Sequence, residues 1–309
     1  MKRGYVDTPE GQVYYVEDGS GEPLVLLHEA PRSSRMYAKL LPLLARDYRV
    51  VALDMLGAGN SDPMAPNARL EDLARCVVHA LDGLLIRRCH LFGLRTGTVV
   101  AGEVAAGWPD RVESLVLFSY PWVEDSQQRE TIAARIAGLP LESSTDGSHL
   151  QKIWMKAYSE VLKMWFHVDN PGPKRSQRPP LQNVHDFLPS ALVEFMDRWV
   201  LDWLQSRACA VQRFRASSTY DAASRLPLIL APTLLIATDS PFEESFLRHA
   251  RKVASLIQRC ETVTLPNSDR NAAELRAEAL AEVIAAFVRR FPLYCGVPEV
   301  RRQCHCEPR

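Results

Sequence analysis

The segment CHLFGLRTGTVVAGEVAAGWPDRVESLVLF, residues 89–118, decides the fold. Its first five residues are typical of a buried strand, and the small residues from 96 to 107 favour a closely packed helix. Between them, Gly93-Leu94-Arg95-Thr96-Gly97 predicts a tight turn, because glycine stands at both ends of it. Such a turn holds one side chain at the tip of the strand, and here that side chain is an arginine.

The rest of the chain repeats this alternation of strand and helix. Several apolar runs are separated by segments of helix length, which is typical of a parallel sheet covered by helices on both sides. The aromatic run 12–17 before the turn DGSGEP predicts a strand of an antiparallel hairpin. The expected strands are 12–17, 23–28, 48–54, 89–93, 113–118, 232–237 and 261–266, and the expected helices are 35–46, 69–86, 96–107 and 272–291.

The stretch 124–220 differs from the rest, because it has helical periodicity and no convincing strand. It holds four of the six tryptophans, Trp154, Trp165, Trp199 and Trp203, and a Pro-rich break at 171–180. This pattern predicts a helical cap inserted into an α/β core. The expected units are a core of 1–123 and 221–292, a cap of 124–220, and a C-terminal tail of 293–309.

Composition excludes several classes of partner. Among the 309 residues, Lys and Arg number 37 and Asp and Glu number 37, so no net charge favours nucleic acid or an anionic membrane. No apolar segment follows the first residues, and the longest apolar run, LPLILAPTLLIA, is interrupted by Pro232. We therefore expect a cytoplasmic protein, monomer or homodimer, with a small molecule as its partner. The seven cysteines have no regular spacing and are expected to be reduced.

No motif for a cofactor or a metal stands out. LGAGNSD, residues 56–62, lacks the third glycine and the later acidic residue of a dinucleotide site. Cys304-His305-Cys306 has no second pair of ligands at the spacings that zinc sites use. We expect neither a metal nor an organic cofactor.

Four motifs in order carry a family resemblance. They are His28-Glu29-Ala30-Pro31, the DMLGAGNSD segment of residues 54–62, the turn 93–97, and WPDRV at 108–112. The chain resembles the α/β-hydrolase superfamily, with H-G-x-P, D-x-x-G-x-G-x-S-D, G-x-S-x-G and P-x-R-V at matching intervals. The resemblance implies a doubly wound, mostly parallel sheet with an inserted helical cap and no cofactor.

The catalytic triad of such enzymes is altered at two of its three positions. By the resemblance, the nucleophile falls on Arg95, the acid on or near Asp239, and the base on Arg270. A guanidinium cannot attack a carbonyl carbon or accept a proton at neutral pH. Covalent serine-hydrolase chemistry is therefore not expected.

Other groups remain available for catalysis. The resemblance implies an oxyanion hole from the backbone N–H of Thr96 and that of Glu29 or Ala30, and backbone donors do not depend on side-chain identity. His28 is chemically able to act as a base, although relatives use it to hold the loop. His149, in a polar turn before an expected helix at 150–164, is a second candidate base or else part of a helix N-cap.

Two roles are open for the arginines. Arg95 can form an ion pair with Glu29, and Arg270 one with Asp239, since none of these charges should be buried alone. Alternatively, one or both arginines bind a carboxylate or phosphate of the substrate. The sequence does not decide between the two.

Aromatic residues of the cap are candidates for ligand binding. The segment 187–205 places apolar side chains on one helical face, which either pack against the core or line a pocket. The expected substrate-binding residues are Tyr120, Trp122, Trp154, Trp199 and Trp203. The ligand would be apolar or aromatic, with an anionic end if an arginine is free to bind it.

Two classes of function follow. The first is an enzyme without a covalent nucleophile, acting as a lyase or by decarboxylation, elimination, cyclisation or water-mediated hydrolysis, with the oxyanion hole stabilising negative charge. The second is an inactive hydrolase homologue that binds a small ligand or a protein partner.

Overall fold

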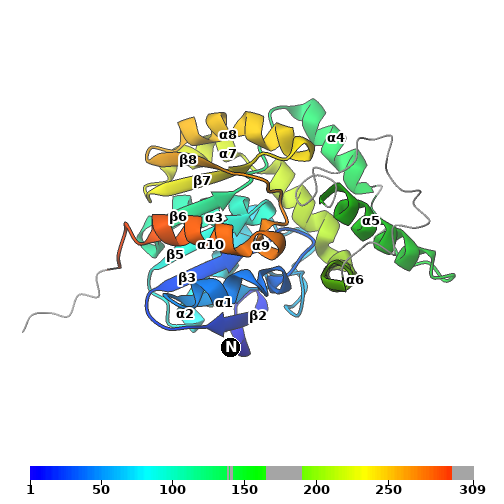
Figure 1. Ribbon diagram of the computed structural model, residues 1–309, viewed down its shortest axis with the longest axis horizontal. Coiled ribbons are helices and arrows are strands. Elements are labelled where there is room, and N and C mark those ends of the chain that lie inside the picture. Colours follow the sequence, from blue (N-terminus) through cyan, green and yellow to red (C-terminus); the bar gives the residue numbers. More distant parts are fainter. Residues whose placement is uncertain (138, 140–141, 165–189, 294–309) are drawn as a thin grey trace, which may run out of the picture.

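An eight-stranded sheet runs through the centre of the molecule in the computed structural model, which describes residues 1–137, 139, 142–164 and 190–293 (Figure 1). The strand order is β1-β2-β4-β3-β5-β6-β7-β8. β2 pairs antiparallel with β1 and β4, and all other pairs are parallel. The strands are β1 Lys2–Thr8, β2 Gly11–Asp18, β3 Pro23–Leu27, β4 Arg49–Leu53, β5 Cys89–Leu94, β6 Val112–Phe118, β7 Thr233–Thr238 and β8 Cys260–Leu265.

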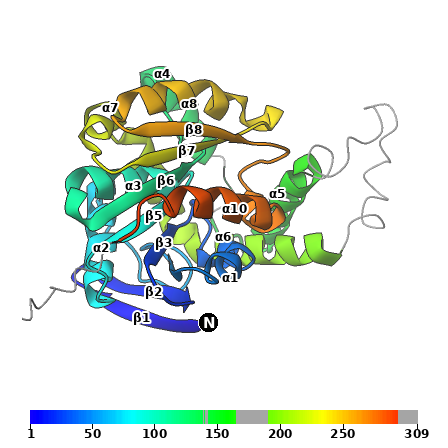
Figure 2. The same ribbon diagram turned by 60° about the vertical axis from the view of Figure 1, so that its left-hand side comes forward.

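Helices cover both faces of the sheet, as Figure 2 shows. Side chains alternate along each strand, so Val25 packs toward α2, α3 and α8, whereas Leu24 packs toward α1 and α10. The predicted doubly wound α/β fold is confirmed. The helices of the core are α1 Leu40–Leu44, α2 Leu70–Gly83, α3 Thr96–Gly107, α7 Ala222–Arg225, α8 Glu244–Leu256, α9 Ala272–Leu275 and α10 Ala277–Val288, with 3₁₀ turns at Ser34–Tyr37, Pro109–Arg111, Leu226–Leu228 and Pro241–Glu243.

The beginning of the chain differs from the prediction. β1 was not expected, because it lies at the sheet edge and Val6 is its one buried residue. β2 forms its hairpin with β1 through the turn at residues 9–10, while DGSGEP leads to β3, which is not a neighbour of β2. The expected helix 272–291 is divided between α9 and α10, and α8 was not expected.

Three cap helices lie between β6 and β7 in the chain and at one end of the sheet (Figure 1). They are α4 Ser126–Ala137, α5 Ser148–Met164 and α6 Ser190–Thr219. α5 and α6 share their own apolar cluster, which includes Ile153, Phe195 and the two tryptophans Trp199 and Trp203. Trp165, the Pro-rich break and residues 294–309 of the expected tail lie outside the described residues.

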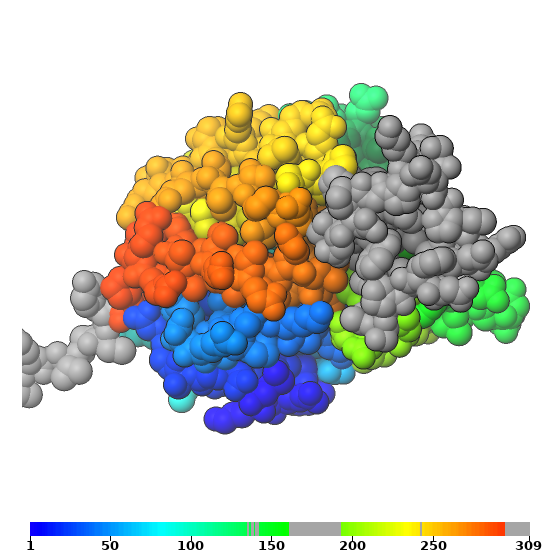
Figure 3. Space-filling view, in the orientation of Figure 1, coloured from blue at the N-terminus to red at the C-terminus, as the bar shows by residue number. Residues whose placement is uncertain are grey.

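The two ends of the described chain pack together on one face of the molecule. Figure 3 shows the blue N-terminal part beside the orange part that contains α9 and α10. α1 and α10 contribute to the same apolar cluster, through residues such as Leu40 and Leu280. This contact fixes α9 and the loop before it close to the loop that follows β3.

The turn between β5 and α3 requires its glycines. Arg95, at the N-terminal cap of α3, has φ of 51°, a left-handed conformation that few non-glycine residues adopt. A Cβ on Gly93 would lie 2.5 Å from the carbonyl oxygen of Gly97, and a Cβ on Gly97 would collide with the carbonyl oxygen of Leu27. Close contact between α3 and β3 therefore fixes the direction of residue 95.

We expect Gly97→Ala to destabilise the fold by more than about 2 kcal/mol, because the new methyl group meets rigid backbone. Gly102→Ala on the same helix is the control, since its Cβ would meet nothing closer than 3.7 Å. Alanine there should be neutral or stabilise the protein by up to about 1 kcal/mol, through helix propensity. Urea unfolding of both variants measures the difference, and equal stabilities would contradict the account of the turn.

Candidate active site

A cavity of about 420 Å³ lies between the cap and the carboxyl end of the sheet. Its wall is formed by the loop after β3, the turn at Arg95 and Thr96, the segment around Glu243, the loop at Asp269 and Arg270, and side chains of α4, α5 and α6. Ligands of open α/β sheets bind at this edge. The fold thus brings Arg95 and Arg270, where the nucleophile and the base were expected, into one cavity.

Arg95 is held by two acidic side chains. Its Nη1 lies 2.8 Å from Oε1 of Glu243, its Nε lies 3.7 Å from Oε2 of Glu29, and its guanidinium stacks on the ring of Phe246 at 3.8 Å. The predicted ion pair with Glu29 is therefore present. Glu243 was missed, although it lies four residues after Asp239, near the position where the resemblance put the acid.

Arg270 pairs with the cap. Its Nη2 lies 2.8 Å from Oε2 of Glu160 in α5. Burial alone would lower the pKa of Arg270, but carboxylates, those of Glu29 and Glu160 first, outweigh burial and raise it. Asp239 instead accepts hydrogen bonds from the backbone N–H groups of Asn267 and Ser268, at 2.8 and 3.1 Å. The expected pair of Asp239 with Arg270 is wrong, because the cap supplies a closer acid and Asp239 closes its own loop.

Both ring nitrogens of His28 are hydrogen-bonded to backbone groups. Its Nδ1 donates to the carbonyl oxygen of Glu29 at 2.8 Å, and its Nε2 accepts the N–H of Met55 at 2.9 Å. Burial, followed by the positive charge of Arg213, lowers the pKa of His28 well below its usual value. The proposed role of His28 as a base is wrong, since its accepting nitrogen already has a donor; the side chain holds the loop.

The expected oxyanion hole is changed by a side chain. The N–H of Ala30 donates to Oγ1 of Thr96 at 2.6 Å. Of the two alternatives expected beside Thr96, the N–H of Ala30 is therefore already used within the protein, and the N–H of Glu29 stays a prediction. The N–H of Thr96 lies in the first turn of α3, where no intrahelical acceptor exists.

His149 belongs to the start of a cap helix. Its Nδ1 lies 3.0 Å from Oγ of Ser144, and Asp146 accepts the N–H of Ser148 at 3.0 Å. His149 is absent from the described wall of the cavity. Of its two possible roles, the structure supports the part of a helix N-cap and not that of a base.

The expected aromatic residues fall into two groups. Trp199 and Trp203 are in the wall of the cavity, stacked on each other with ring centroids 4.6 Å apart. Tyr120 and Trp122 line a separate cavity of about 90 Å³, and Trp154 packs against the apolar cluster of the cap. The five predicted residues thus do not share one cavity, since a side chain's direction on a helix or loop depends on packing, and their role in binding stays a prediction.

Asp269 is an acid that the sequence reading overlooked. It lines the cavity next to Arg270, and its carboxylate accepts the N–H of Asn271 at 2.8 Å. Burial, and then the negative charge of Glu243, raises the pKa of Asp269 to about 6. Its place beside Arg270, where the base was expected, was the one signal available in the sequence. A carboxyl group of this kind can gain and lose a proton near neutral pH.

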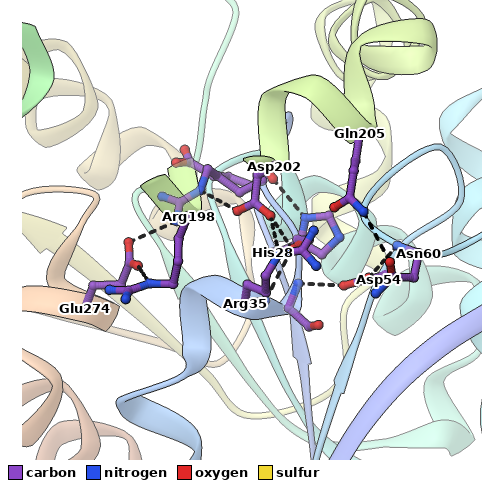
Figure 4. A network of polar contacts seen from close by, with 12 residues as sticks. His28, Arg35, Asp54, Asn60, Arg198, Asp202, Gln205 and Glu274 are labelled. Atoms are coloured by element: carbon purple, nitrogen blue, oxygen red, sulfur yellow. Dashed lines mark hydrogen bonds and ion pairs between the residues drawn. The ribbon is translucent and has the colours of Figure 1, made fainter. Parts of the chain in front are cut away.

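Buried ion pairs join the cap to the core. Arg32, in the loop after β3, donates from Nε to Asp202 at 2.8 Å and from Nη2 to Glu274 at 3.0 Å. Figure 4 shows that Asp202 also accepts a hydrogen bond from Arg35, and Glu274 one from Arg198, with His28 beside them. Arg32 and Asp202 are completely buried. The network was not predicted, because its members are far apart in the sequence.

Other features give no additional site. In the described part of the chain, no three His, Cys, Asp or Glu side chains gather in a way that could hold a metal ion. Its four cysteines are free thiols. None of the described helices combines the length and apolarity needed to cross a membrane.

Comparisons with known sequences and structures agree with this fold. Residues 22–161 match the model of the alpha/beta hydrolase fold family. The chain is 27% identical over 166 residues to an (E)-2-((N-methylformamido)methylene)succinate hydrolase of Acinetobacter baylyi, a match that covers 51% of this chain and 62% of that protein. It is 28% identical over 140 residues to haloalkane dehalogenase 2 of Mycobacterium tuberculosis, covering 45% and 49%. These matches thus span about half to three fifths of the two relatives.

Similarity of structure extends over nearly the whole chain. The enol-lactonase of Burkholderia xenovorans superposes with a TM-score of 0.69 and 21% identity, covering 93% of this chain and all of that one. A hydrolase of Pseudomonas aeruginosa gives a TM-score of 0.67 at 22% identity, covering 93% and 98%. Together with the sheet order, the turn at Arg95 and the family match, these similarities show that the chain has the α/β-hydrolase fold.

Proposed function

We propose that the protein is an enzyme that binds a small, largely apolar molecule between cap and sheet and converts it by proton transfer, without a covalent intermediate. The observation that carries this proposal is the carboxyl group of Asp269 in the cavity wall, with its pKa raised to about 6. A group that titrates near the working pH is suited to general acid–base catalysis. Arg95 and Arg270 stand where the resemblance places nucleophile and base, and each is bound to a carboxylate.

Several reactions need only such proton transfer. Elimination, decarboxylation, cyclisation and hydrolysis by an activated water molecule each require a base or an acid at the reacting atom. The named relatives are a hydrolase and a dehalogenase, which supports a small organic substrate. Asp269 would accept or deliver the proton, while Arg95 and Arg270 stay paired with Glu243 and Glu160.

A second candidate is a protein that binds a ligand without converting it. The hydrogen bond from Ala30 to Thr96 favours this alternative, because it occupies a donor that an acyl-transfer enzyme would need. The ion pairs of Arg95 and Arg270 also argue against covalent catalysis. Turnover and binding therefore have to be measured side by side.

Asp269 should make the protein less stable as the pH rises. The folded state holds the proton of Asp269 up to a pKa of about 6, above the ordinary value of 3.8. Stability is therefore lost between about pH 4 and pH 6, by up to about 3 kcal/mol. We expect Asp269→Asn to be more stable than wild type at pH 7.5 and similar to it at pH 4. Thermal unfolding of both proteins at both pH values measures this difference.

Asp146→Asn is the control, and its expected effect on stability has the opposite sign. Hydrogen bonds from the backbone N–H of Ser148, and then from Ser144, lower the pKa of Asp146 to about 2. This variant should be less stable than wild type at pH 7.5. If Asp269→Asn behaves in the same way, Asp269 is a structural anchor of its loop, and the assignment of a proton-transfer role fails.

The activity itself can be tested with a panel of small ketones, lactones, hydroxy acids and esters, followed by mass spectrometry. We expect turnover that falls about 100-fold or more in Asp269→Asn, with KM little changed and a pH profile with a limb near 6. Asp146→Asn should keep full activity.

A serine-directed fluorophosphonate completes this test. Wild-type protein should not be labelled, because residue 95 carries no attacking atom. Stoichiometric labelling, or full activity of Asp269→Asn, would show that the proposed route is wrong. Saturable binding without turnover of any compound would favour the second candidate.

A further inference from the structure

Helix α6 carries apolar side chains on two opposite faces. One face buries Trp199 and Trp203 in the apolar cluster that α6 shares with α5. On the opposite face, the side chains of Val193, Leu201 and Val211 are 42%, 45% and 36% exposed. A helix that packs on one side only usually has polar residues on the other. The exposed apolar face of α6 therefore indicates a surface that meets another molecule.

The exposed face forms one straight line along the helix, which we call the outer stripe. It lies at the lower edge of the cap in Figure 2, with α5 above α6. Spacings of four and three positions alternate along it, as in the seam of a coiled coil. Its residues are Asp197, Leu201, Leu204, Ala208, Val211 and Arg215, of which Leu204 is half-buried and the others are exposed.

The two ends of the outer stripe carry opposite charges. In the described part of the chain, neither Asp197 nor Arg215 forms an ion pair. Arg198, the position after Asp197, pairs with Glu194 and Glu274 instead. Each end of the stripe therefore offers a charge that a second molecule can pair with.

Two copies of the outer stripe fit one another when their helices run antiparallel. With a two-fold axis at the level of residue 206, position 197 faces 215, 201 faces 211, and 204 faces 208. Asp197 of each copy then meets Arg215 of the other, and every apolar residue between them meets an apolar residue. In a parallel pair, like charges would meet at both ends. The pattern of the stripe is thus complementary to itself in the antiparallel direction.

The helix is also held in place before any partner binds. On the face away from the outer stripe, Asp202 forms a buried ion pair with Arg32 of the core, with 2.8 Å between Oδ2 and Nε. A surface on a rigid element loses little conformational entropy when it binds. The outer stripe is therefore a preformed surface.

We propose that the outer stripe of α6 is the interface of a homodimer, in which two copies of α6 pack antiparallel with an Asp197–Arg215 ion pair at each end. Two-fold dimers use the same patch of both subunits in this way. A single pair of helices is a small interface, so we expect a Kd of roughly 1–100 µM. The inference does not depend on the proposed function, because the cavity is lined by the other face of α6.

Sedimentation equilibrium of the full-length protein between about 1 and 200 µM measures the association. The average mass should rise from that of the monomer toward that of the dimer. Leu201→Glu puts a charge opposite Val211 of the second copy and should weaken association about tenfold or more. Leu247→Glu is the matched control, because Leu247 lies on α8 and is 40% exposed; this variant should associate as wild type does.

Exchange of the two charges tests the antiparallel register. Asp197→Arg and Arg215→Asp each bring like charges together at both ends, and each should weaken association about 3- to 10-fold. The double variant restores both ion pairs with their signs exchanged and should associate as wild type does. A parallel pair gives no such rescue, because each position would then face its own copy.

Three results would overturn the proposal. They are wild-type protein that stays monomeric at about 200 µM, a dimer that Leu201→Glu leaves intact, and a double charge variant as weak as the single ones. Thermal unfolding shows whether each variant is folded, and Ala208→Glu replaces Leu201→Glu if the latter is not. No outcome depends on turnover, so this inference and the proposed function fail or stand separately.

Discussion

The buried ion cluster of Arg32, Asp202 and Glu274 is the constraint on which the arrangement of cap and core depends. Its partners are 170 and 242 positions apart from Arg32 in the chain, so it joins the loop after β3 to α6 and to α9 at once. A charge in a fully buried position is tolerated only when it is paired. Separation of the cap from the core would leave these charges without partners, and the cluster therefore fixes the cavity above the sheet.

The same rule accounts for the surroundings of Arg95 and Arg270. An arginine at the turn after β5 and another in the loop after β8 each require an acid nearby, and the fold supplies Glu243 for Arg95 and Glu160 for Arg270. The second of these pairs also connects cap and core. Burial, followed by the negative charge of Glu243, raises the pKa of Asp269 beside Arg270.

The predictions that were confirmed have their signal within one short segment. β3 and β5 are buried on both faces, so their apolar runs identify them without any neighbour. The turn at Arg95 was also predictable, because its glycines are required by local contacts with β3 and within the turn. β1 was missed for the opposite reason: an edge strand with one buried side chain has almost no apolar pattern.

The sequence by itself determined the α/β order of elements and the presence of arginines at positions 95 and 270, since each depends on residue type at a local motif. Only the tertiary structure decided which acid meets which arginine, that Thr96 occupies the N–H of Ala30, and that Asp269, Trp199 and Trp203 share one cavity. The reason is physical: an ion pair or a hydrogen bond forms between side chains that folding brings within about 3 Å, and sequence distance carries no information about that approach.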